Sequence, residues 1–166
     1  MTKRPKIKIK LSPLDWLIEL AAFLVLFVFW SVLLWTFNDL PEQIPTHFNA
    51  AGQADAFGSK SNLFSLPIIS TVMVIGLTFL NRYPHLFNYP QEITDTNAEY
   101  QYRWACRLIR WLKLVVALIF SAIGLTVIWT DDATQDGLGW WFLPSTLLLV
   151  FGSILFFIYK SLKDNK

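Results

Sequence analysis

The sequence has few charged residues for its length. Asp, Glu, Lys and Arg make up only 16% of the 166 residues, whereas hydrophobic residues make up 54%. A soluble domain typically contains about a quarter charged residues. The net charge of +2 is also too small to predict binding to nucleic acid. These values indicate an integral membrane protein that forms one domain over residues 1–166.

Cysteine and histidine are scarce as well. A single cysteine, Cys106, excludes an intramolecular disulfide. The two histidines, His47 and His85, fall short of the four Cys or His ligands that structural zinc usually requires. We predict neither a metal nor a cofactor, and the lack of a catalytic constellation favours a non-enzymatic role.

Long apolar segments, by contrast, occur four times. A helix needs roughly 20 residues to cross about 30 Å of hydrocarbon. Four segments approach or exceed this length, at residues 14–37, 63–80, 114–130 and 140–159. The first is too long for a cleaved signal sequence, and no cleavage site follows it, so we interpret it as a retained anchor. The predicted fold class is all-α, a polytopic protein with four transmembrane helices.

Seven small residues lie within the last three predicted spans. They are Ser70, Thr71, Gly76, Ser121, Gly124, Gly152 and Ser153. Small side chains let helices approach closely in lipid. They predict a compact bundle of four helices and not a pore.

Basic residues are distributed unevenly between the predicted connections. Of the 14 Lys and Arg residues, only Lys60 lies between the first two spans, and none lies between the last two. Cytoplasmic segments are enriched in Lys and Arg. The pattern predicts a multi-pass protein of a bacterial cytoplasmic (inner) membrane, with both termini in the cytoplasm and residues 38–62 outside.

Two carboxylates lie one helical turn apart near the start of the first span. Ser12 is a natural N-cap, which explains Asp15 as an acid in the first turn of the helix. Glu19 lies inside the apolar segment, where an ionisable group is costly and usually has a partner. We expect an ion pair with Arg107 or Arg110. The alternative is a role of Glu19 in handling protons or ions.

The predicted outer connection, residues 38–62, is unusually polar. It is longer than the roughly 12–15 residues that a loop without structure of its own usually has. Ile44, Phe48, Phe57 and Leu63 provide apolar anchors, so we expect a structured cap on the bundle. Its candidate binding residues are Pro45, His47, Phe48, Asn49, Gly52, Asp55 and Lys60.

His47 and Asp55 allow two interpretations. They could ligate a metal, or act as a base with an orienting acid. The cap could instead use its polar groups to hold itself rigid and to recognise a partner. We favour recognition. The alternative is a metal-assisted membrane enzyme or an ion-coupled transporter that uses His47, Asp55 or Glu19.

A second polar segment, NRYPHLFNYP at 81–90, follows the second span. It lies on the cytoplasmic side in the predicted topology, so its histidine cannot share an ion with His47. Thr96 and Glu99 predict a capping box for the helix that continues into the third span. Residues 81–113 thus form an inner connection and a helix. The candidate residues of this inner motif are Asn81, Arg82, Tyr83, Pro84, His85, Asn88, Tyr89 and Pro90.

The two polar segments resemble a known family. LPEQIPTHFNAAGQADAFGSK after a first span resembles the bacterial membrane family called domain of unknown function 1648, and NRYPHLFNYP is similar to a segment of many short members. The matching features of the first motif are Pro41, Ile44, Pro45, His47, Phe48, Gly52, Asp55 and Lys60. The resemblance extends over about residues 15–110. The same module forms the N-terminal part of longer immunity proteins that protect cells from the secreted Sdp toxin peptide.

Residues and resemblance together predict a recognition or immunity-accessory role through the outer loop, residues 41–60. The expected partners are the lipid bilayer and an extracytoplasmic peptide or envelope protein. The sequence leaves open the ligand, the transfer of toxin immunity to a chain with four spans, and association into a homo-oligomer.

Overall fold

Four long helices dominate the structure, a computed structural model that describes residues 4–129 and 137–163. They are α1 (Pro13–Thr36), α2 (Ser65–Leu80), α3 (Ala98–Trp129) and α4 (Phe142–Lys163). The shorter elements are η1 (Phe37–Asp39), β1 (Gln43–Phe48), β2 (Ala54–Ser59), η2 (Lys60–Phe64) and η3 (Pro84–Leu86). With α2 counted together with the preceding η2 (Lys60–Leu80), all four are long and apolar enough to cross a membrane, which confirms the predicted helical fold. The expected end of the third span, Thr130, lies outside the described residues.

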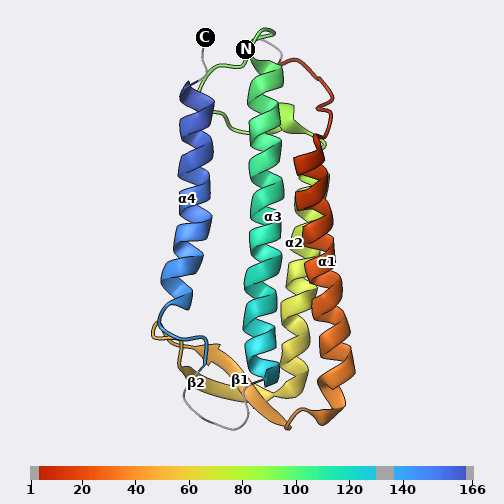
Figure 1. The fold of residues 1–166 in the computed structure, drawn as a ribbon, viewed down its shortest axis with the longest axis vertical. Coiled ribbons are helices and arrows are strands. Elements are labelled where there is room, and N and C mark those ends of the chain that lie inside the picture. Colours follow the sequence, from red (N-terminus) through yellow and green to blue (C-terminus); the bar gives the residue numbers. More distant parts are fainter. Residues whose placement is uncertain (1–3, 130–136, 164–166) are drawn as a thin grey trace.

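The four helices run alternately up and down, which gives the molecule two distinct ends (Figure 1). One end, here called the hairpin end, carries β1 and β2. The opposite end, here called the tail end, holds the start of α1, the connection from α2 to α3, and the last turn of α4. Lys60 is the one Lys or Arg at the hairpin end among the residues that the structure describes.

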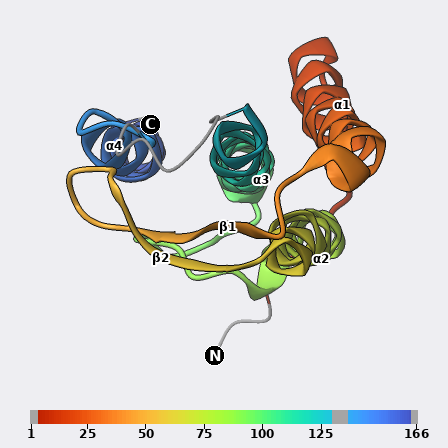
Figure 2. The same ribbon diagram turned by 90° about the horizontal axis from the view of Figure 1, so that it is seen from below.

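Helices α1, α2 and α3 pack together, whereas α4 packs mainly on α3 (Figure 2). A methyl group added at Gly124 of α3 would lie 2.2 Å from Cζ of Phe29, so this glycine admits the aromatic ring of α1. Ser70 and Ser121 are also buried, as expected for close helix approach. Gly76 has no neighbouring atom within 4 Å of an added Cβ. Helices α1, α2 and α3 thus form the compact part of the bundle, and α4 lies beside α3.

Hydrogen bonds fasten α4 to α3 and to the connection that precedes α3. Trp111 of α3 donates from Nε1 to Ser153 Oγ at 2.7 Å. At the tail end, Gln91 and Gln101 donate from their side-chain amides to the carbonyl oxygen of Ser161, at 2.9 and 3.0 Å. Ser161 is the one buried residue in the described length of α4. These hydrogen bonds, together with ring contacts of Trp104 with Phe156 and Phe157, hold α4 against α3.

The predicted capping box of α3 is wrong in its residues. The backbone N–H of Asn97 donates to Thr94 Oγ1 at 3.3 Å, and the backbone N–H of Thr94 donates to Asn97 Oδ1 at 2.9 Å. Glu99 instead pairs with Arg103, one turn along the helix, at 2.5 Å. The short Asn97 side chain reaches back to the preceding turn, and so the reciprocal cap lies two residues earlier than the predicted one.

Candidate functional site

The predicted cap at the hairpin end is an antiparallel β-hairpin. β1 pairs with β2 from Gln43 opposite Ser59 to Phe48 opposite Ala54. In the turn, Asn49 Oδ1 accepts hydrogen bonds from the backbone N–H groups of Ala51 and Gln53, at 2.9 and 3.1 Å. Asn and Asp side chains stabilise turns in this way. The sequence predicted a structured cap here but no strands, because Pro45 and the irregular register obscure the alternating pattern.

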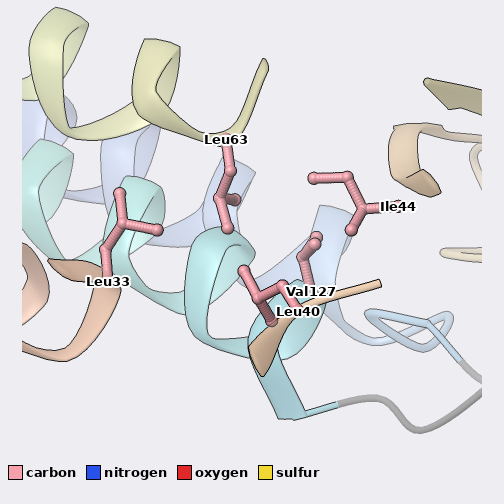
Figure 3. Close-up of a cluster of buried hydrophobic side chains, with 5 residues drawn as sticks. All are labelled: Leu33, Leu40, Ile44, Leu63 and Val127. Atoms are coloured by element: carbon pink, nitrogen blue, oxygen red, sulfur yellow. The ribbon is translucent and has the colours of Figure 1, made fainter. Parts of the chain in front are cut away.

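An apolar cluster fixes the base of the hairpin to the helices (Figure 3). It consists of Leu33, Leu40, Ile44, Leu63 and Val127, which come from α1, the hairpin, α3 and the segments that join them. Ile44 and Leu63 were predicted anchors and are buried, and Phe48 packs against the cluster. Phe57 is 50% exposed, so its predicted role as an anchor is wrong. Neighbouring strand residues face opposite sides, and its neighbour Gly58 is the one opposite Ile44.

The tip of the hairpin docks against the segment that precedes α4. The backbone N–H of Leu138 donates to the carbonyl oxygen of Gly52 at 2.8 Å. Gly52 has φ +78°, and a Cβ there would lie 2.4 Å from the Gly139 oxygen. A Cβ at Gly137 would lie 2.6 Å from the Phe48 ring. Gly52 and Gly137 therefore permit this close contact, and only Gly52 was singled out in the sequence.

Lys60 fastens the hairpin to the segment that precedes it. Its ammonium group donates to the carbonyl oxygen of Leu40 at 3.2 Å, lies 3.2 Å from a carboxylate oxygen of Glu42, and sits 5.3 Å from the centre of the Phe37 ring. The Lys60 side chain is only 16% exposed. These contacts use the cation within the cap and leave little of it for a ligand.

His47 and Asp55 form the exposed polar pair of the hairpin. His47 Nδ1 lies 2.5 Å from Asp55 Oδ1, and the two side chains are 68% and 43% exposed. Strand pairing places His47 opposite Ala56, next to Asp55. In the part of the chain that the structure describes, no group of three or more His, Cys, Asp or Glu residues could hold a metal ion. The pair alone offers two ligating groups.

At the tail end, two acids of α1 face three cations of α3. Asp15 is buried and accepts a hydrogen bond from Nε of Arg107 at 2.9 Å. Glu19 pairs with the ammonium group of Lys113, and its other oxygen lies 3.6 Å from Nε of Arg110. We call these five residues the ionic cluster. α1 and α3 run in the same direction (Figure 1). Residues three or four positions apart lie on the same face of a helix, so successive acids of α1 lie beside successive cations of α3.

The predicted pairing of Glu19 with arginine is confirmed for Arg110 and wrong for Arg107. Arg107 lies one turn nearer the start of α3 and is level with Asp15. Lys113 was not predicted as a partner of Glu19. It is fully buried and also donates to Thr78 Oγ1 at 2.9 Å. The Ser12–Asp15 cap is confirmed as a reciprocal capping box. The signal that could have revealed Lys113 is the three-residue spacing of the cations on α3.

The inner motif, residues 81–90, holds the N-terminal tail in place. Arg4 donates to the carbonyl oxygens of Phe87 and His85 at 2.6 and 3.3 Å, and its guanidinium lies 5.6 Å from the centre of the Tyr89 ring. Tyr89 donates to the Pro84 carbonyl oxygen at 2.8 Å, and burial raises the pKa of this phenol.

Of the remaining inner-motif residues, Asn81 donates from its amide to the Cys106 carbonyl oxygen at 3.2 Å. Arg82 lies 4.8 Å from the centre of the Phe79 ring, and Tyr83 makes an edge contact with His85. Asn88 and Pro90 are exposed. The two histidines lie at opposite ends of the molecule, since β1 and η3 are at opposite ends (Figure 1).

In comparisons with known proteins, a family match covers the segment that contains the hairpin. Residues 23–71 match the family described as Domain of unknown function (DUF1648). An uncharacterized protein of Archaeoglobus fulgidus is 36% identical over 104 residues, which cover 56% of this chain and 56% of the archaeal protein. The match thus spans about half the length of that relative. No solved structure matches the chain.

The predicted resemblance is therefore confirmed for the second half of α1, the hairpin, η2 and the start of α2. This matched segment is narrower than the predicted extent of residues 15–110. The inner motif and the ionic cluster lie outside it.

Proposed function

We propose that this protein is a non-enzymatic membrane protein whose hairpin recognises an extracytoplasmic peptide or envelope protein. The observation that carries the proposal is that the hairpin is fixed at its base and at its tip, while His47 and Asp55 remain exposed. A binding surface that is rigid beforehand loses less conformational entropy when a partner binds. The family match over residues 23–71 includes the whole hairpin.

The proposed orientation places the hairpin end outside the cytoplasmic membrane and both termini in the cytoplasm. The described Lys and Arg residues support it, since only Lys60 lies at the hairpin end. Cytoplasmic segments near span ends carry the excess of basic residues. Lys60 is also engaged within the cap, so it adds little free positive charge on the outer side.

The charge of the hairpin end favours a partner that is basic or neutral. The exposed acids Asp39, Glu42 and Asp55 outnumber the single cation, Lys60. Opposite charge speeds association and disfavours wrong partners. The same surface would carry the immunity or accessory role that the resemblance to Sdp immunity proteins implies, with a secreted peptide as the ligand.

Photo-crosslinking from the outside of cells tests recognition directly. A photoreactive residue at Phe57, which is half exposed and close to Asp55 in the strand, should capture a discrete partner. H47A/D55A should abolish this adduct. N38A, which removes an exposed but uncharged side chain outside the strands, should leave it intact. The same adducts from the wild type and H47A/D55A would count against recognition through the hairpin.

The alternative is ion-coupled transport through Glu19. The ion pairs of this acid within the protein explain its presence in the span without a transport role. The cations of Lys113 and Arg110 neutralise it. Metal-assisted chemistry at His47 and Asp55 is tested by metal analysis of detergent-purified protein. A stoichiometric ion that is lost in H47A would replace the recognition proposal with this one.

A further inference from the structure

A cavity of about 470 Å³ opens at the tail end, far from the hairpin. The N-terminal segment at residues 7–11 forms one wall. The others come from the start of α1, the end of α2 with residues 81–84, and Arg110 of α3. Arg4 holds this segment in place through its bonds to the Phe87 and His85 carbonyl oxygens. Specific hydrogen bonds therefore position one wall of the cavity, which lies at the tail end of the helices.

The lining of the cavity combines unpaired positive charge with apolar walls. Lys8, Arg82 and Arg110 contribute three cations, and Glu19 contributes the one acid. Glu19 is already paired with Lys113 and Arg110. Neither Lys8 nor Arg82 forms an ion pair with a carboxylate within the described residues. Two cations thus remain for an anion.

The apolar walls distinguish this cavity from a site for a small hydrophilic ion. Ile7, Leu11 and Trp16 line it and are exposed, and most of the lining surface is apolar. Exposed apolar side chains next to Lys and Arg at the end of a membrane span suit the boundary between headgroups and acyl chains. A ligand that fills this cavity needs an anionic head and an apolar tail.

We propose that this cavity binds the phosphodiester headgroup of an anionic phospholipid. Lys8 and Arg82 donate to the phosphate oxygens, and the upper part of an acyl chain packs on Ile7, Leu11 and Trp16. Basic pockets between membrane helices on the cytoplasmic side bind anionic headgroups by the same chemistry. The site is independent of the hairpin, since it shares no residue with it.

Native mass spectrometry of the full chain tests the site. The protein is released from mixed micelles that contain phosphatidylglycerol and phosphatidylcholine, and retained lipids are counted. The wild type should retain phosphatidylglycerol selectively. K8Q/R82Q should weaken this retention by roughly tenfold to thirtyfold, because two basic contacts to an anionic lipid are lost.

The matched control is K6Q/R103Q, which removes two cations from the same end without touching the cavity lining. It should retain phosphatidylglycerol as the wild type does. Equal losses in both double variants would show diffuse surface attraction and overturn the site, as would no loss in either. R82Q alone, at an exposed position, provides the same comparison if K8Q/R82Q does not fold.

A test with inorganic phosphate distinguishes a site for a phospholipid headgroup from a site for free phosphate. Phosphate and chloride are added at equal ionic strength while the midpoint of thermal unfolding is followed. Phosphatidylglycerol should raise the midpoint of the wild type but not of K8Q/R82Q, and phosphate should have no more effect than chloride. A rise with phosphate as large as that with phosphatidylglycerol would make this a site for free phosphate and overturn the lipid assignment.

Discussion

The hairpin end and the tail end are held together by different interactions. At the hairpin end, strand pairing, close contacts at Gly52 and Gly137 and an apolar cluster fix the backbone, and the polar pair His47–Asp55 remains exposed. At the tail end, five charged side chains are engaged with one another between α1 and α3. The two ends therefore differ in how they use their polar groups. The hairpin leaves His47 and Asp55 exposed, whereas the ionic cluster uses its charges to join helices.

The largest expected effect is at the ionic cluster. K113M should lower the free energy of unfolding by about 3–5 kcal/mol, because a buried ion pair that loses one partner leaves an uncompensated charge. Unfolding in detergent, followed by the helical circular dichroism signal, measures it. The double variant E19Q/K113M is the control and should recover most of the loss. A double variant as unstable as K113M would mean that packing, and not charge, dominates this end.

The hairpin end should respond most to a backbone change. G52A should destabilise the hairpin by about 1–3 kcal/mol, because a left-handed conformation and a steric overlap both oppose a side chain. The overlap is with the Gly139 backbone, 2.4 Å from the added Cβ. Limited proteolysis within residues 49–53 reports the opening. A51S, at the exposed neighbouring position, should leave the cleavage rate unchanged, and equal rates in both variants would contradict the tip contact.

Each end also has one cation that binds backbone carbonyl groups, and these two should be comparable. Lys60 donates to Leu40, and Arg4 donates to Phe87. K60Q and R4Q should each reduce stability by about 1–2 kcal/mol, because each variant loses the hydrogen bonds that one charged side chain donates to carbonyl groups. Hydrogen exchange should accelerate only around the hairpin in K60Q and only around residues 81–90 in R4Q. Faster exchange at both ends in either variant would contradict the independence of the two ends.

The smallest effect on stability is expected for the exposed polar pair. H47A/D55A should change the free energy of unfolding by less than about 0.5 kcal/mol, since exposed ion pairs contribute little. Unfolding in detergent, followed by circular dichroism, measures the stability, and photo-crosslinking at Phe57 measures recognition in the same variant. Loss of the crosslinked adduct together with unchanged stability would separate recognition from folding. A loss of several kcal/mol would instead make the pair a structural part of the hairpin.

Much of the fold follows from residue patterns along the chain. Runs of apolar residues identify the four spans, because the bilayer requires a helix of a certain length. Ser12 followed by Asp15 identifies the start of α1, because an N-cap uses residues three positions apart. The hairpin was not identified as strands, since Pro45 and two register shifts interrupt the alternation on which strand prediction depends. The family resemblance identified this segment without revealing its structure.

Other features depend on contacts between distant residues. The sequence paired Glu19 with arginine in general, but only the parallel alignment of α1 and α3 assigns Arg107 to Asp15 and places Lys113 beside Glu19. The role of Gly137 could not be predicted, because it depends on the hairpin tip that packs against it. The cavity at the tail end depends likewise on the position of residues 7–11 over the end of α2.

The sequence by itself determined how often the chain can cross a bilayer, which segments are polar, and on which side of the spans the cations lie. Those properties depend on local hydrophobicity and charge, which each segment carries regardless of its neighbours. Only the tertiary structure decided that α4 stands beside a three-helix bundle, that the outer loop is a hairpin with His47 and Asp55 exposed, and that Lys8 and Arg82 border one cavity. Helix register and side-chain burial decide these features, and both depend on contacts between segments far apart in the chain.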